Sequence, residues 1–384
     1  MIPFNKPFCT GDELEFIRQV IQRGKFCGNG YYTHLCQSYF QEKYGFKKCL
    51  LTTSCTDALE MCAILAGVAY GDEVIIPSYT FVSTALAFAR QGATIVFADS
   101  TTENPNIDPD AIEKLITKKT KAIVVVHYAG ITCNMDRIVE IAKMHSIILI
   151  EDAAQAIDSY YISPKTNMKN PLGSIGDLAA FSFHETKNIQ CGEGGILVVN
   201  NENLIGRSEI VWEKGTNRAE FFRGEVNKYE WVDLGSSFLA SEYTAAFLYA
   251  QLLKMEVIQK RRIDIWNIYY EGLKDIKQIT IPKIPEYATN NAHMFYLICR
   301  SEKERSELIA WMKDNEIQLV FHYLSLHKSR FYEKHNPELS RKSLPKADLY
   351  TDCLVRLPFY YGLSDQEIKT VINLIREFFA KLLI

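Results

Sequence analysis

Short apolar segments alternate with helical segments through the first half of the chain. The apolar segments cover residues 73–76, 94–97, 121–126 and 146–150, and helical periodicity fills 81–89, 108–117 and 136–145 between them. Strands that alternate with helices form a parallel sheet covered by helices on both faces. Ligands bind such sheets beyond the carboxyl ends of the strands. The pattern therefore predicts an α/β fold with its functional site at that edge.

Small polar residues open the first helix after a strand. Ser54, Cys55 and Thr56 follow the apolar segment 49–52 and precede a helix over 58–65. Free backbone N–H groups and the positive end of the helix dipole make such a start suitable for a phosphate group. Simple capping of the helix is the other interpretation.

An acidic residue follows the apolar strand 146–150. Asp152 would emerge at the same edge of the sheet as Ser54. A carboxylate there either faces a cationic partner or caps the next helix, and its position alone decides neither.

One lysine lies between two further predicted strands, 178–183 and 195–200. Lys187 precedes the glycine-rich segment Gly192-Glu-Gly-Gly195. Desolvation beyond a buried strand lowers the pKa of a lysine and turns its amine into a nucleophile. Taken alone, a lysine in this position is most often a solvated loop residue, so the position of Lys187 does not by itself indicate a nucleophile.

Composition excludes several classes of function. The 384 residues are 47% hydrophobic and 23% charged, and 43 basic against 46 acidic residues leave a net charge of −3, so nothing indicates nucleic-acid binding. The sequence shows no apolar run of the length that a signal peptide or a membrane helix needs. Its ten cysteines are scattered singly, which favours reduced thiols and a cytoplasmic protein. His184-Glu185 lacks the second histidine of a metalloprotease motif, so we expect no metal.

The second half of the chain predicts a smaller domain. We expect a large domain over 1–250 and, over 251–384, a connecting helix followed by a small α/β domain. Within these, the pattern indicates an exposed loop at 163–172, a binding or subunit-contact loop at 214–233 and a long helix over 241–273. It also indicates strands near 293–299 and 317–321 and helices near 303–314 and 365–380.

The groups at the predicted sheet edge match the needs of one cofactor. Pyridoxal 5′-phosphate (PLP) requires an anion cup, an aromatic face, a carboxylate for its pyridine nitrogen and an amine. Ser54, Phe81, Asp152 and Lys187 supply these four groups in that order.

Four segments carry a resemblance to a known family. They are Pro77-Ser-Tyr-Thr-Phe81, Glu151-Asp-Ala-Ala-Gln155, Phe181-Ser-Phe-His-Glu-Thr-Lys187 and Gly192-Glu-Gly-Gly195. Together they resemble the nucleotide-sugar aminotransferases of the DegT/DnrJ/EryC1/StrS group over essentially the whole chain. The resemblance implies the fold type I architecture of PLP-dependent aminotransferases, with a large, mainly parallel sheet domain and a smaller C-terminal α/β domain.

The resemblance also implies roles for individual residues. Lys187 would hold the cofactor covalently and shuttle the proton, Asp152 would pair with the pyridinium, Phe81 would stack on the ring and Gln155 would lie near its 3-hydroxyl. His184 would lie behind these contacts. The residues that would hold the phosphate are Ser54, Cys55, Thr56 and Ser182.

One motif departs from the family pattern. Many members have Gly-Tyr-Asn-Tyr-Arg where this chain has Gly235-Ser-Ser-Phe-Leu239, so Ser237 replaces an asparagine that reaches the phosphate in the neighbouring subunit. Serine can still donate one hydrogen bond. The implied assembly is a homodimer with shared active sites, or a higher homo-oligomer.

Residues that would face the substrate are implied in three places. They are Lys25 and Asn29 in the loop 25–30, Arg218 in the segment 214–231, and His322 with Tyr323. Lys25 or Arg218 could neutralise a diphosphate. A packed core His322 and a solvated Arg218 are the equally weighted alternative.

The implied reaction is a transamination with L-glutamate as the amino donor. Met1-Ile-Pro-Phe-Asn5, Lys214-Gly-Thr-Asn-Arg218 and Phe321-His-Tyr323 resemble the family members that make dTDP-4-amino-4,6-dideoxygalactose. The expected acceptor is therefore dTDP-4-keto-6-deoxy-D-glucose, with 2-oxoglutarate as the second product, in the synthesis of a deoxyamino sugar for lipopolysaccharide or another surface polysaccharide. Amination of a 3-keto sugar, amination with the opposite stereochemistry, and a catalytically silent PLP-binding regulatory protein remain alternatives.

Overall fold

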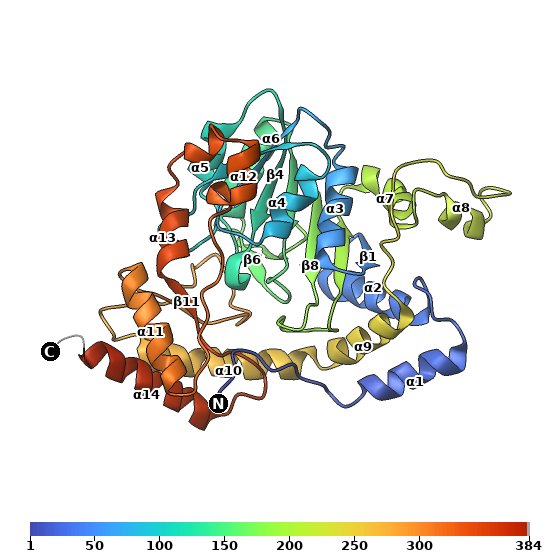
Figure 1. Cartoon of the computed structure of the whole chain (residues 1–384). Coiled ribbons are helices and arrows are strands. Elements are labelled where there is room, and N and C mark those ends of the chain that lie inside the picture. The colour runs from blue at the N-terminus through green and yellow to red at the C-terminus, as the bar shows by residue number, and fades with distance from the viewer. Residues whose placement is uncertain (382–384) are drawn as a thin grey trace.

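A seven-stranded sheet forms the centre of the protein. The computed structural model describes residues 1–381, and its strand order is β1-β9-β8-β5-β4-β2-β3 (Figure 1). The strands are β1 (Lys48–Thr52), β2 (Glu73–Pro77), β3 (Thr94–Ala98), β4 (Thr120–Val126), β5 (Ile148–Asp152), β8 (Leu178–Ser182) and β9 (Gly195–Val199). The carboxyl ends of β2, β5 and β8 therefore lie on one edge of the sheet.

Strand β9 runs against all the others. It pairs antiparallel with β8 and with β1, whereas β8, β5, β4, β2 and β3 are mutually parallel. Because the connection from β8 to β9 holds no helix, the chain turns back and pairs antiparallel. The α/β fold with a mainly parallel sheet is confirmed, and this turn is what delivers Lys187 to the sheet edge.

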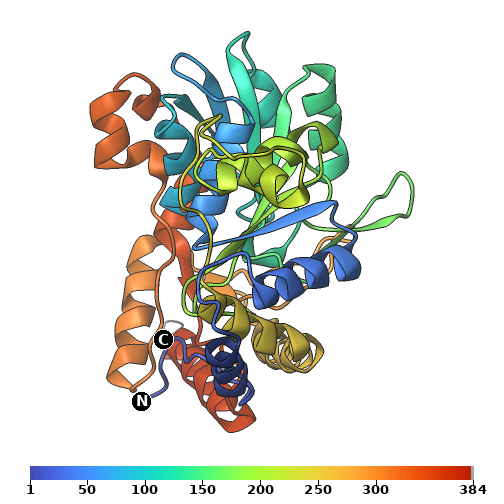
Figure 2. The same cartoon turned by 90° about the vertical axis from the view of Figure 1, so that its right-hand side faces the viewer.

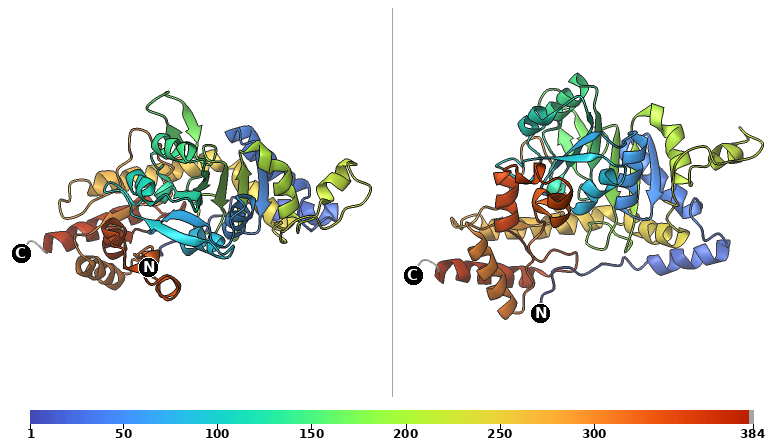
Figure 3. Two further views of the ribbon diagram at one scale, coloured as in Figure 1. Left: turned by 90° about the horizontal axis from the view of Figure 1, so that it is seen from above. Right: turned by 45° about the horizontal axis from the view of Figure 1, so that its top comes forward.

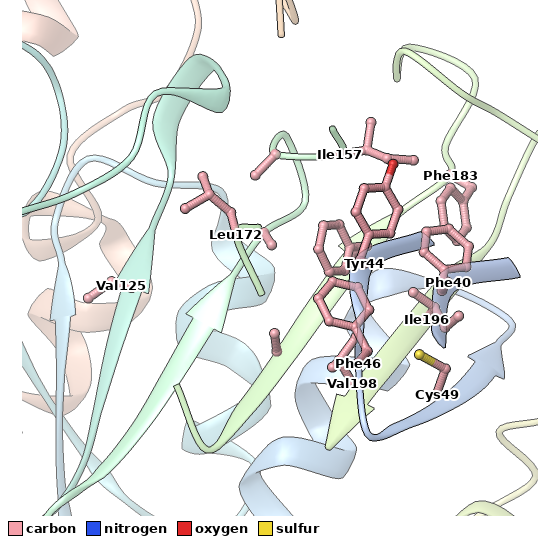
Figure 4. Packing of buried hydrophobic residues seen from close by; sticks show 14 of the residues in the cluster. Phe40, Tyr44, Phe46, Cys49, Val125, Ile157, Leu172, Phe183, Ile196 and Val198 are labelled. Carbon is pink, nitrogen blue, oxygen red and sulfur yellow. The ribbon is translucent and has the colours of Figure 1, made fainter. Parts of the chain in front are cut away.

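Helices cover both faces of the sheet because alternate strand residues point to opposite sides (Figures 2 and 3). On β2, Ile75 packs into one core cluster while Val74 and Ile76 pack into the other. The first cluster contains residues of α2 (Tyr31–Tyr44), α6 (Met135–Met144) and α9 (Glu242–Leu253); Figure 4 shows Phe40 and Phe183 in it, near Ile196. The second contains residues of α3 (Cys55–Leu65), α4 (Val82–Ala89) and α7 (Ile205–Trp212). Other covering elements are α1 (Glu13–Arg23), α5 (Pro109–Leu115), η1 (Tyr128–Gly130) and η2 (Glu202–Leu204).

The C-terminal part builds a third core. Its cluster joins α10 (Met255–Leu273), α11 (Glu302–Asp314) and α14 (Asp365–Lys381) with the strand pair β10 (Tyr296–Ile298) and β11 (Leu354–Arg356). Further elements are η3 (Leu326–Lys328), α12 (Arg330–His335), η4 (Leu339–Arg341) and α13 (Pro345–Cys353). Whether the domains divide at residue 250 stays a prediction.

Several expected elements differ from the structure. The helix expected over 241–273 is two helices, because Lys254 leaves helical geometry between α9 and α10. The strand expected at 317–321 is wrong: Ile317 and Val320 form only isolated bridges. The loop expected at 163–172 includes the strand β7 (Lys169–Pro171), which pairs with β6 (Tyr160–Ile162) just before the loop. The loop expected at 214–233 includes the helix α8 (Arg218–Arg223).

Helix α2, which the sequence did not indicate, begins without a capping side chain of its own. The buried carboxylate of Glu242, at the start of α9, accepts hydrogen bonds from the backbone amides of Gly30 (3.1 Å), Tyr32 (2.8 Å) and Thr33 (3.0 Å). The Thr33 hydroxyl donates to the same carboxylate at 2.5 Å. A residue more than 200 positions away therefore supplies the cap.

We expect Glu242→Gln to lower the free energy of unfolding by about 2–4 kcal/mol, because the amide group turns an N–H₂ donor toward backbone donors and removes the buried charge. Urea unfolding at fixed protein concentration measures this. Glu256→Gln, at an exposed position in the first turn of α10, is the matched control and should change stability by less than about 0.5 kcal/mol. Equal losses in the two variants would contradict the capping role.

Two features are absent from residues 1–381. No helix there is both long and apolar enough to cross a membrane. No group of three or more histidine, cysteine, aspartate or glutamate side chains in this range could hold a metal ion.

Candidate active site

A cavity of about 540 Å³ opens at the carboxyl edge of the sheet. Its walls come from the strand ends and from the segment that follows Val320 in the C-terminal part. The sequence-predicted residues that line it are Ser54, Cys55, Thr56, Phe81, Asp152, Gln155, Ser182, His184, Lys187, His322 and Tyr323. These residues lie up to 269 positions apart in the sequence, and the fold brings them together.

Lys187 lies in the turn between β8 and β9, where its backbone N–H donates to the carbonyl of His184 at 2.8 Å. Burial lowers the pKa of Lys187 to about 8, although Cys55 and Asp152 oppose the shift. At neutral pH a far larger fraction of this side chain is a free amine than in an exposed lysine. Lys187 can therefore act as a nucleophile and as a base.

Asp152 ends β5 with its carboxylate held in place. The Thr84 hydroxyl donates to one oxygen at 2.7 Å, and the backbone N–H of Ala154 donates to the other at 3.1 Å. Burial raises the pKa of Asp152, while these two hydrogen bonds and the charge of Lys187 act in the opposite direction. Within residues 1–381 no lysine or arginine ion-pairs with it, so the fold leaves an oriented buried carboxylate for a cation inside the cavity.

The start of α3 forms the opposite end of the cavity. Ser54 caps the helix by accepting from the backbone N–H of Asp57 at 3.1 Å, so the capping interpretation is correct. The backbone N–H groups of Cys55 and Thr56 lie in the first turn of α3, where the helix offers no carbonyl to accept from them. They therefore remain free to bind an anion. A Cβ on Gly195 would lie 2.4 Å from the Cys55 nitrogen, so only glycine lets β9 approach this turn so closely. The hydroxyl of Ser182, at the end of β8, also lines this cavity.

The C-terminal wall of the cavity is aromatic. Tyr323 accepts a hydrogen bond from the Gln155 side chain at 2.9 Å, and the Tyr323 ring lies 6.0 Å from the ring of Phe81. His322 stacks on Tyr323 and forms a 2.7 Å hydrogen bond with the hydroxyl of Tyr128. Burial holds the pKa of His322 well below its usual range, so it is a neutral imidazole in this wall.

Four predicted residues lie elsewhere, around Glu213. Asn29 donates to the Glu213 carboxylate at 2.9 Å, the Arg218 guanidinium lies 3.6 Å from it, and Ser237 forms a backbone bridge with Glu213. Lys25 donates to the Asn29 carbonyl at 2.5 Å. None of the four lines the cavity that contains Lys187 of the same chain.

Sequence reasoning missed seven polar residues of the cavity, which are Thr80, Ser83, Thr84, Thr186, Glu193, His293 and Arg356. A usable signal existed only for Arg356, which is a single charge inside the apolar run Leu354-Val-Arg-Leu357. A charged residue within an apolar run of this kind indicates a side chain that has a functional role in the protein interior.

The cavity fits PLP. It offers an amine, a carboxylate without a cationic partner, an aromatic face at Phe81 and free amides at a helix start, and its volume suits a small cofactor with a substrate. The fit rests on Lys187 and Asp152 lining one cavity.

Comparisons with known proteins agree with this geometry. Residues 8–376 match the family described as the DegT/DnrJ/EryC1/StrS aminotransferase family. The spore coat polysaccharide biosynthesis protein SpsC of Bacillus subtilis is 32% identical over 98% of this chain and 96% of its own length. Among solved structures, the aminotransferase TlmJ from Streptoalloteichus hindustanus superposes with a TM-score of 0.90 at 27% identity, covering 100% of both chains. The PLP form of Spr1654 from Streptococcus pneumoniae has a TM-score of 0.89 at 25% identity, covering 99% of both. The chain belongs to the DegT/DnrJ/EryC1/StrS family and is a PLP-dependent sugar aminotransferase.

Proposed function

We propose that this enzyme transfers the amino group of L-glutamate to C4 of dTDP-4-keto-6-deoxy-D-glucose, giving dTDP-4-amino-4,6-dideoxygalactose and 2-oxoglutarate. The observation that carries the proposal is that Lys187 and Asp152 share a cavity whose outer wall is the uncharged Phe321-His322-Tyr323 segment. Such a wall suits a deoxy sugar, which offers an apolar methyl group and a few hydroxyls. The Bacillus relative is named as a spore coat polysaccharide biosynthesis protein, which also supports an amino sugar for a surface polysaccharide.

The residues that line the cavity each have a defined role in this proposal. Bound PLP supplies an electron-withdrawing ring that carries the amino group between the two half-reactions. Asp152 keeps positive charge on the ring nitrogen, and the Lys187 amine takes the proton from one carbon and returns it at another. The α3 start and Ser182 hold the phosphate, Phe81 covers the ring, and Gln155 lies near its 3-hydroxyl.

We also propose that two copies of the chain complete each active site. Lys25, Asn29, Arg218 and Ser237 would then serve the neighbouring subunit's cavity from their position around Glu213. The segment that carries α8 supports this, because it projects from the body of the molecule (Figure 1) and exposes large apolar side chains. Trp231 is 77% exposed and Leu234 is 63% exposed, as expected of a surface that a second copy covers. We place the assembly in the cytoplasm.

Incubation with dTDP-4-keto-6-deoxy-D-glucose and L-glutamate, followed by NMR of the product, tests the reaction. The proposal expects an axial 4-amino group and one equivalent of 2-oxoglutarate per amino sugar. An equatorial amine would assign the opposite stereochemistry, and reaction of a 3-keto isomer alone would assign C3. A cofactor absorption band that glutamate leaves unchanged would indicate a silent binding protein.

The pKa of Lys187 predicts the pH dependence of cofactor binding. The rate at which the cofactor-free protein takes up PLP should rise with pH, because the free amine reacts, and should level off above a midpoint near 8. An exposed lysine, with a pKa near 10.4, would still gain rate well above pH 9. Stopped-flow absorbance between pH 6.5 and 10 measures this. Lys187→Ala supplies the background from other lysines, and a midpoint near 10 would contradict the effect of burial.

A further inference from the structure

One half-buried cation of the cavity has no ion-pair or hydrogen-bond partner for its guanidinium within residues 1–381. Arg356 ends β11, and its Nε is fully enclosed without a hydrogen-bond acceptor. Among residues 1–381 its guanidinium takes part in no ion pair and in no side-chain hydrogen bond. The buried Arg262 differs, because its guanidinium donates to the backbone carbonyls of Ala292 (3.1 Å) and His293 (2.6 Å). The fold therefore supplies acceptors for the buried guanidinium of Arg262 and supplies none, within residues 1–381, for the half-buried guanidinium of Arg356.

The backbone fixes Arg356 beside the aromatic wall. Its N–H donates to the carbonyl of Val320 at 2.8 Å, and its Cα pairs with that of Tyr296 across β10 and β11. The Phe4 ring lies 4.6 Å from the guanidinium carbon. The side chain lines the cavity together with Lys187, and its charge contributes to the lowered pKa of Lys187. Arg356 is thus oriented by its strand and covered on one side, with the cavity before it.

The charges around the cavity leave Arg356 without a counter-ion. Burial keeps the pKa of both His293 and His322 well below the usual range, so neither histidine carries charge. In the proposed function Asp152 would pair with the ring nitrogen, and the side chain of Glu193 is 72% exposed. An unpaired guanidinium that is partly withdrawn from water, with its Nε fully enclosed, carries a desolvation cost that an anionic ligand would offset.

Two chemical features identify the anion. A guanidinium presents two parallel N–H donors that match a carboxylate, and the amino donor carries its α-carboxylate on the carbon that loses the proton. That carboxylate must lie beside Lys187, which shares this cavity. The diphosphate of the nucleotide sugar is attached at C1, across the hexose ring from C4, and the cofactor phosphate has the start of α3. We propose that Arg356 binds the α-carboxylate of the amino donor and thereby restricts donors to amino acids; this inference rests on the proposed use of glutamate.

The test separates the two substrates. In the PLP-loaded enzyme, Arg356→Met should raise the KM for glutamate and the Kd for 2-oxoglutarate by about 100-fold, because two charge-assisted hydrogen bonds are lost. The KM for the nucleotide sugar should change by less than about 3-fold. Arg356→Lys keeps the positive charge but lacks the two parallel N–H donors of the guanidinium, so it should recover part of the lost affinity for glutamate and 2-oxoglutarate. Isothermal titration with 2-oxoglutarate gives a readout that does not depend on turnover.

A second comparison identifies which carboxylate is bound. The wild-type enzyme should react with 4-aminobutyrate, which lacks the α-carboxylate, at least about 100-fold less efficiently than with glutamate, and Arg356→Met should reduce that ratio to within about 5-fold. Arg305→Met is the matched control, since the Arg305 Nε is likewise enclosed without a partner but lies outside the cavity. It should leave both substrates unaffected, and circular dichroism checks the fold of every variant.

Three results would overturn the inference. They are an unchanged glutamate KM in Arg356→Met, an equal loss for the nucleotide sugar, and a glutamate to 4-aminobutyrate ratio that survives the substitution. If wild-type enzyme instead accepts a different amino acid, the proposed donor fails while Arg356 is still tested with that amino acid and its decarboxylated amine.

Discussion

Lys187→Ala should abolish transamination, with a loss in kcat of roughly 10⁴-fold or more, because one side chain supplies both the covalent attachment and the proton transfer. The structure gives Lys187 the properties that both tasks need: it lines the cavity with Asp152, and burial lowers the pKa of its amine to about 8. No other lysine lines the cavity within residues 1–381, so no neighbour can take over. Steady-state assays of 2-oxoglutarate formation measure the loss.

The matched control is Lys169→Ala, an exposed position in β7, which should retain wild-type activity. The Lys187→Ala protein should still bind PLP reversibly through the phosphate and ring contacts, and dialysis should then remove it. Residual turnover within about tenfold of wild type would show that the reacting amine lies elsewhere.

Asp152→Asn should lower kcat by about 10²–10³-fold while the protein still binds PLP, because asparagine is nearly isosteric but cannot stabilise a protonated ring nitrogen. The Ala154 amide, which donates to one carboxylate oxygen now, can still donate to the asparagine oxygen, and the Thr84 hydroxyl at the other position can instead accept from the asparagine NH₂ group. The substitution therefore removes charge and leaves the geometry in place. The kcat of each half-reaction and the absorption maximum of the bound cofactor are the measurements.

Exposed Asp110→Asn, in the first turn of α5, controls for a general change in charge and should have no effect. The kcat of Thr84→Val should lie between those of the wild type and Asp152→Asn. The valine loses one hydrogen bond to the Asp152 carboxylate but leaves the charge of that carboxylate in place. A loss from Asp152→Asn smaller than that from Thr84→Val would contradict the assigned role.

The groups at the sheet edge could be predicted from the sequence because the carboxyl ends of parallel strands lie together at one edge of the sheet. Asp152 directly ends an apolar strand, and Lys187 follows one by a short turn, so their local sequence already assigns both to one edge. The hydroxyl residues at 54–56 are predictable for the same reason, since a helix start after such a strand lies on that edge. The position of these groups can be predicted from residues that are close in sequence, together with the rule that functional groups gather at the carboxyl ends of parallel strands.

Other features depended on contacts between distant segments. The cap of α2 comes from Glu242, and no pattern near residue 31 indicates it. The strand expected at 317–321 is absent because that segment is taken up by single bridges to Ile2 and Arg356 instead of a ladder. Lys25, Asn29 and Arg218 were grouped as substrate residues, but the fold places them around Glu213 and outside their own chain's cavity.

Local sequence patterns were enough to predict the α/β class, the edge of the sheet that carries the functional groups, and the presence of an amine and a carboxylate at that edge. The periodicity of strands and helices can be recognised from neighbouring residues alone. A parallel sheet then places the residues that follow its strands at one common edge. The packing of distant segments sets which wall faces Lys187, because β11 lies against Val320 and leaves the guanidinium of Arg356 in the cavity without a counter-ion among residues 1–381. The reason is that burial and the absence of a partner are properties of the packed neighbourhood, to which every wall of the cavity contributes.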